Sequence, residues 1–175
     1  MTFSIRVEKS GHEAVDVTIG NDRIGGAPDE FVIIDHAGAP FMRIGIHYPP
    51  DEYHLSTEAI TWAGWIVVGF AGRVVLISID DRSQRAIVLS DRQQPLLADY
   101  FCQLYACCDC LLVGSGRKLF RVNTDGSVAW TSSELGLDGV LVHSVDDGIV
   151  SGAGEWDPPG GWLPFAISLK DGSAV

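Results

Sequence analysis

Residues 62–80 constrain the fold more than any other part of this chain. They contain two runs rich in β-branched residues, separated by Ala71-Gly72, which is the pattern of a β-hairpin. The first run, Trp65 to Phe70, shows no alternation of apolar and polar residues. Both faces of that strand must therefore be covered by protein, and a hairpin alone cannot cover itself.

The same pattern recurs along the chain. Four aspartates close apolar strands at spacings of 45, 45 and 46 positions: Asp35, Asp80, Asp125 and Asp171. Turn-forming residues follow each of them. A second marker, an apolar run ending in glycine, precedes each of these strands, at Gly20, Gly69, Gly114 and Gly152. A period near 45 residues indicates structural repeats.

Four strands in each repeat of about 45 residues are typical of a β-propeller blade. We therefore predict one all-β domain over residues 1–175, with repeat units at 13–62, 63–105, 108–145 and 148–175 plus 2–8. The N-terminal strand, residues 3–7, is expected to complete the last antiparallel unit and close a four-bladed ring. The alternative is an open propeller-like stack or a β-sandwich of the same units, completed by dimerisation.

The third repeat reads Leu119-Phe-Arg-Val-Asn-Thr-Asp-Gly-Ser-Val-Ala-Trp130. It resembles the repeat of quinoprotein-like (PQQ-type) β-propellers, in which a strand, an Asp/Thr-Gly turn and a strand ending in Trp recur. The other units match less well, since the unit at Asp80 lacks the Gly and the Trp. The resemblance implies a propeller fold, and we expect no quinone or other cofactor because the calcium ligands of such enzymes have no counterparts here.

The formal net charge of −11 argues against nucleic acid and anionic membranes as partners, since both would be repelled. The same charge fits a cationic partner, or serves solubility alone. No apolar run approaches the ~20 residues of a membrane span, and the N-terminus lacks the pattern of a signal peptide. We therefore expect a cytoplasmic protein.

All four cysteines fall between Cys102 and Cys110. Their spacing lacks the two-residue gap of a zinc knuckle, so we expect reduced, buried thiols and no metal site.

The long connections all fall on one rim of the predicted blades: 21–30, 47–57, 91–98, 131–138 and 154–162. We call this side of the molecule the long-loop rim, and loops of this kind are where binding residues gather on a repeat scaffold. The last connection contains an eight-residue insertion, from Glu155 to Trp162. Two tryptophans beside rigid prolines suit recognition, although they could instead cap the core.

In a closed ring this insertion lies beside the first unit. The candidate binding residues are therefore Glu155, Trp156, Asp157, Trp162, His47, Tyr53, His54 and Arg23. We expect a non-enzymatic binding module, monomeric or dimeric, whose partner is a basic protein such as a toxin that it neutralises. The alternative is a hydrolase or lyase that uses carboxylates and histidines of the same rim. No catalytic residue is assigned, because the spacing of His47, Asp51, His54, Glu155 and Asp157 matches no recognised pattern.

Overall fold

The computed structural model describes residues 2–9, 14–20, 26–50, 52–89, 99–107, 109–157 and 160–175. These residues form fifteen β-strands and no helix, so the described part of the chain is all-β, as predicted. Within them no helix is long and apolar enough to cross a lipid bilayer.

The strands form four sheets. The first has the order β1 (Phe3–Glu8), β3 (Glu30–His36), β4 (Ala39–His47) and β2 (Val17–Gly20). The second contains β5 (Glu58–Trp62), β6 (Trp65–Phe70), β7 (Arg73–Ser78) and β8 (Gln84–Val88). The third contains β9 (Phe101–Ala106), β10 (Cys110–Ser115), β11 (Leu119–Asn123) and β12 (Val128–Thr131), and the fourth β13 (Val140–Asp146), β14 (Ile149–Glu155) and β15 (Trp162–Ser168). All pairs are antiparallel except β2 with β4.

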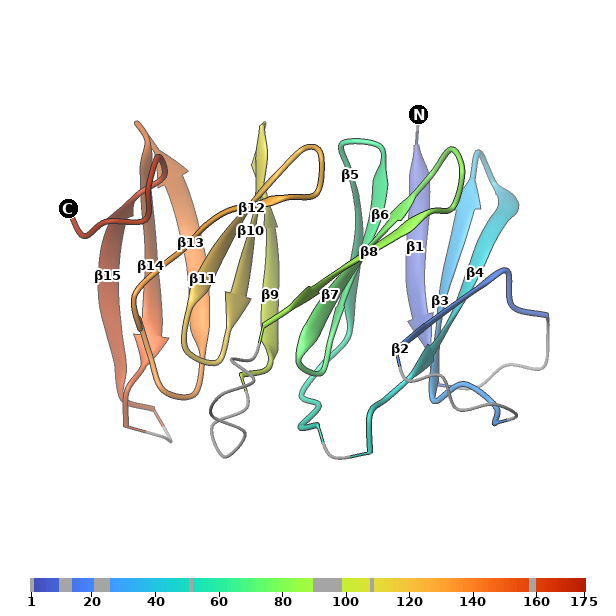
Figure 1. The fold of residues 1–175 in the computed structure, drawn as a ribbon, viewed down its shortest axis with the longest axis horizontal. Helices are drawn as coiled ribbons and strands as arrows, with labels where there is room; N and C mark the ends of the chain where they lie inside the picture. The colour runs from blue at the N-terminus through green and yellow to red at the C-terminus, as the bar shows by residue number, and fades with distance from the viewer. Residues whose placement is uncertain are drawn as a thin grey trace.

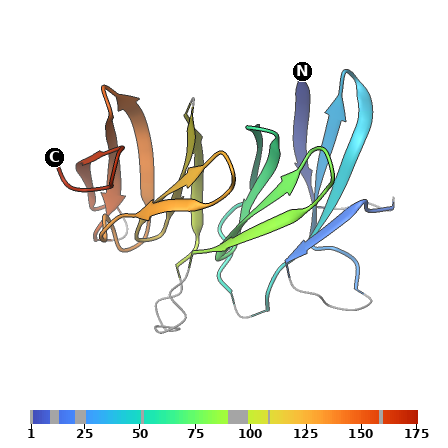
Figure 2. The same cartoon turned by 45° about the horizontal axis from the view of Figure 1, so that its top comes forward.

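The four sheets lie side by side in chain order, with the first and the fourth at opposite ends of the row (Figures 1 and 2). The first strands of successive sheets contact one another, β1 with β5, β5 with β9, and β9 with β13. This arrangement is an open stack of sheets, and no closed barrel or ring is formed by the described residues.

An apolar core fills each of the three spaces between sheets. On β6, Ile66 and Val68 pack toward the first sheet, whereas Val67 packs toward the third. All three side chains are fully buried. The predicted burial of this strand on both faces is thus confirmed, and it follows from its position between two neighbouring sheets.

The predicted pairing of the N-terminal strand with the last repeat is wrong. Strand β1 pairs with β3 of its own sheet, in a register that sets Ile5 opposite Ile34. Phe3 and Ile5 pack against the core between the first two sheets, and Arg6 forms an ion pair of 2.6 Å with Asp35. Local apolar burial and charge pairing hold β1 in the first sheet, and the fourth sheet has three strands plus a bridge from Ile167 to Ala174.

The predicted repeat boundaries are displaced by one strand. The strands that begin near positions 59, 100 and 140 pair with the strand that follows them, so each begins a sheet instead of ending one. The segment ending at Gly20 was predicted to be an inner strand. It is instead β2, an edge strand that pairs in parallel with β4.

A repeated aspartate turn follows the third strand of the second, third and fourth sheets. Asp81, Asp125 and Asp171 each accept two hydrogen bonds at Oδ1, from the backbone N–H and the hydroxyl of the serine two positions later. These bonds lower the pKa of each carboxyl, to about 2 for Asp81. The repeat marker in the second sheet is therefore Asp81 and not Asp80, while Asp35 lies within β3.

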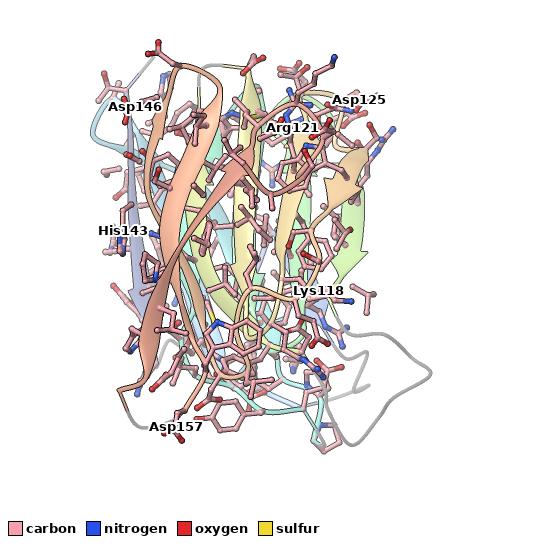
Figure 3. The ribbon with its side chains drawn as sticks, turned by 90° about the vertical axis from the view of Figure 1, so that its left-hand side faces the viewer. Lys118, Arg121, Asp125, His143, Asp146 and Asp157 are labelled. Carbon is pink, nitrogen blue, oxygen red and sulfur yellow. The ribbon has the colours of Figure 1, made fainter. Side chains whose placement is uncertain are left out.

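Because the strands alternate in direction, successive connections lie at opposite ends of the sheets. Short turns lie at one end of the sheets, including Ala63-Gly64, whose two positive φ angles of 47° and 84° form a tight hairpin turn. The described parts of the long connections after β4, β12 and β14 lie at the other end, which is the long-loop rim (Figure 1). In Figure 3, Asp125 and Asp146 mark the short-turn end, and Asp157 marks the long-loop rim.

Candidate functional site

Exposed apolar side chains gather along the long-loop rim. Among the described residues, six of the ten large hydrophobic side chains classed as exposed belong to its connections or to the first two residues of β15. They are Tyr53, Leu55, Leu137, Trp156, Trp162 and Leu163. A concentration of this kind on one side of a protein is typical of an interaction surface.

The connection between β14 and β15 presents two of these side chains. Trp156 is 38% exposed and Trp162 is 40% exposed, so neither ring is buried in the core. The loop is held by its own hydrogen bonds, since Trp156 N–H donates to the Gly161 carbonyl at 2.9 Å and Gly160 N–H donates to Glu155 Oε1 at 2.6 Å. Glu155 therefore braces the loop that displays Trp156.

The connections of the rim contact one another in sequence. The Tyr53 and Tyr100 rings pack edge to face with centroids 5.1 Å apart. The Tyr100 hydroxyl donates to Asp138 Oδ1 at 2.7 Å, and Asp138 N–H in turn donates to the Glu155 carbonyl at 3.2 Å. These contacts join the connection after β4 to the end of β14, so the described parts of the rim form a continuous surface.

A pocket of about 610 Å³ opens at the first-sheet end of the rim. It lies where β1 ends, β3 begins and β4 ends. Its lining residues are Lys9, Asp29, Glu30, Tyr48, His54, Leu55, Ser56 and Thr57.

Local sequence explains why polar groups line this pocket. Glu30 is the first residue of β3 and pairs with Ile46, so it shares a sheet face with the buried Val32 and Ile34. It is only 8% exposed. The Pro49-Pro50 pair ends β4 immediately beyond Tyr48, because proline cannot continue a strand ladder.

The aromatic wall of the pocket is formed by Tyr48 and His54, whose rings stack with centroids 4.0 Å apart. The Tyr48 hydroxyl lies 3.0 Å from Thr57 Oγ1. Burial, reinforced by the neighbouring Glu30 carboxylate, raises the pKa of Tyr48, which keeps the phenol protonated. Burial lowers the pKa of His54, and the Glu30 carboxylate opposes that shift.

The residues predicted from sequence occupy both ends of the rim. His54 and Tyr53 lie near the pocket, but His47 is the last residue of β4 and is only 7% exposed. Glu155, Trp156, Asp157 and Trp162 belong to the fourth sheet, at the other end of the stack (Figure 1). The expected meeting of this loop with 47–54 does not occur, because it required a closed ring. Arg23 and Asp51 lie outside the described residues.

Sequence reasoning missed Glu30 and Tyr48. A carboxylate directly before the apolar run Phe31-Val-Ile-Ile34 was a usable indication, since a strand with two buried faces rarely begins with a charge. The neighbour of that carboxylate could not be read from the sequence, because His54 belongs to the connection after β4 and reaches the start of β3 only in the folded chain.

Among the described residues, Cys102 and Cys110 are free thiols. Cys110 is fully buried, and burial raises the pKa of Cys102 to about 12. Cys108 lies outside the described residues. In the part of the chain that the structure covers, no three His, Cys, Asp or Glu side chains converge as metal ligands.

A scan against protein-family models finds no match for this chain, and a search of curated proteins finds no significantly similar sequence.

Proposed function

We propose that this chain is a binding module whose protein partner docks on the long-loop rim. One observation carries the proposal, namely the concentration of exposed Tyr53, Leu55, Leu137, Trp156, Trp162 and Leu163 on a continuous surface. Aromatic side chains held on a rigid scaffold are the usual anchors of protein interfaces. The hydrogen-bonded loop around Trp156 supplies that rigidity at the fourth-sheet end.

The proposed partner is basic. A net charge of −11 on 175 residues attracts cationic proteins and repels nucleic acid and anionic lipid. A module that neutralises a cationic toxin is one concrete form of this function. Association should therefore weaken as ionic strength rises, because salt screens charges that face each other across a wet interface.

We also propose that the four sheets are propeller-type blades arranged as an open arc, related to the quinoprotein-like repeat. The contacts of β1, β5, β9 and β13 from sheet to sheet support this proposal, as does the repeated aspartate turn. No quinone cofactor is part of the proposal.

The test is an affinity purification from the native cell with three forms of the protein. The wild type should capture a partner that Trp156→Ala loses. Val128→Ala is the matched control, because Val128 is 42% exposed and begins β12 beside the short turns. If Trp156→Ala and Val128→Ala retain the partner equally, and a Tyr53→Ala, Leu137→Ala double variant does so too, docking on this rim is wrong.

A further inference from the structure

The pocket at the first-sheet end contains two buried polar atoms that no described residue satisfies. Glu30 Oε2 and His54 Nδ1 are both buried and have no hydrogen-bond partner among the described residues, although the Tyr48 hydroxyl interacts with the same Glu30 carboxylate. A buried polar atom without a partner costs about 1–3 kcal/mol, so such atoms are uncommon unless a ligand completes them. Glu30 is the stronger indication because its side chain is 8% exposed and lines the pocket.

The chemistry of these groups defines what could complete them. An ionised carboxylate only accepts hydrogen bonds, and a neutral imidazole can accept at Nδ1. The lowered pKa of His54 favours the neutral ring at pH 7. A second carboxylate, Asp29, is fixed in the wall by the Tyr48 N–H, which donates to Asp29 Oδ2 at 2.8 Å. A ligand must therefore bring donors and positive charge.

Among the described lining residues, one cation faces the pocket. Lys9 lines it from the end of β1, where it is exposed to solvent. The described lining thus contributes two carboxylates, Asp29 and Glu30, and one ammonium, a balance that attracts a further cation.

We infer that this pocket binds the guanidinium group of an arginine side chain. A guanidinium carries five N–H donors in a plane, which can reach acceptors on different walls, and its flat face stacks on aromatic rings. The stacked Tyr48 and His54 rings provide such a surface beside Glu30. An ammonium is a compact, strongly hydrated charge and uses neither the plane nor the stack. The inference rests on the proposed function, because the arginine would belong to the basic protein partner that docks on the rim.

The experiment titrates purified full-length protein with N-acetyl-arginine methylamide and follows backbone amide shifts by NMR. The matched ligand control is the citrulline derivative, which has the same shape without charge. We expect saturable shifts at Glu30, Tyr48 and His54 with the arginine compound. The citrulline compound should bind at least about tenfold more weakly, the difference that one charge-assisted hydrogen bond commonly makes.

Two pocket variants and one control complete the design. Glu30→Gln keeps the side-chain shape and should weaken arginine binding about tenfold or more. His54→Phe keeps the ring stack but removes Nδ1, and should weaken binding by a smaller factor. Asp147→Asn, in the exposed short turn between β13 and β14, should leave binding unchanged. Thermal unfolding of each variant establishes that it is folded.

Three outcomes would overturn the inference. They are equal binding of the arginine and citrulline compounds, no saturable shift up to about 50 mM ligand, or unchanged arginine binding by both folded Glu30→Gln and folded His54→Phe. The titration needs no partner protein. If the titration fails but Trp156→Ala loses the partner, the arginine inference is wrong and the docking proposal stands. If the titration succeeds but the rim variants retain the partner, the docking proposal is wrong and the arginine inference stands.

Discussion

The side-chain amide of Gln103 on β9 binds both backbone polar groups of Val142 on β13. Gln103 Nε2 donates to the Val142 carbonyl at 3.3 Å, and Val142 N–H donates to Gln103 Oε1 at 2.8 Å. One sheet earlier, Leu104 N–H donates to Glu58 Oε2 at 2.8 Å. In both cases a side chain of one first strand satisfies the backbone edge of the next, so hydrogen bonds as well as apolar cores join neighbouring sheets.

Replacing Gln103 should loosen the fourth sheet. Gln103→Ala leaves the N–H and the carbonyl of Val142 without their partner at a partly buried edge. We expect a loss of about 1–3 kcal/mol in the free energy of unfolding, measured by urea denaturation. Gln84→Ala is the control, because Gln84 is exposed on β8. Identical transition midpoints for the two variants would contradict the role of this brace.

The second prediction concerns the close approach of Gly69 to Phe101. A Cβ at position 69 would lie 2.2 Å from Phe101 Cε2, across the boundary between the second and third sheets. Gly69→Ala should therefore force the ring or the sheets apart and cost about 1–3 kcal/mol. Gly26→Ala should be nearly neutral, since nothing lies within 4 Å of its added Cβ. Equal melting temperatures of Gly69→Ala and Gly26→Ala would show that the sheets repack freely.

The third prediction concerns pH and His54. Burial lowers the pKa of His54 below its ordinary value, so the unfolded chain binds a proton more readily than the folded protein. The contribution of His54 to stability is present above pH 6.5, the ordinary value, and is lost as the pH falls through the lowered folded value. The wild type should thus lose more stability than His54→Phe between pH 7.5 and about 5.

Thermal unfolding of both proteins over this range provides the measurement. The other histidines are present in both proteins and cancel in the comparison. Parallel curves for the two proteins would mean that His54 titrates alike in the folded and unfolded states.

Several features of this protein were determined by the sequence alone. The all-β secondary structure follows from the runs of β-branched residues. Burial on both faces of β6 follows from the absence of polar residues between Trp65 and Phe70. The tight turn at Ala63-Gly64 and the aspartate turn at Asp125 are also local, because each depends on residues a few positions apart. The gathering of the long connections on one rim was also predicted from the sequence. Alternating strand direction sets the end at which each connection lies, and the residue ranges give its length.

Only the tertiary structure decided which strand pairs with which. Strand β1 has an apolar face that any open sheet edge could accept, and the ion pair of Arg6 with Asp35 and the burial of Phe3 and Ile5 select β3. That selection opens the ring and separates Trp156 from His54. It also creates the pocket, because Glu30 and His54 are 24 positions apart and converge only when the segment after β4 folds back over the start of β3. Distant segments compete to pair with a given strand. The pattern of residues along one strand does not show which of these pairings has the lowest free energy.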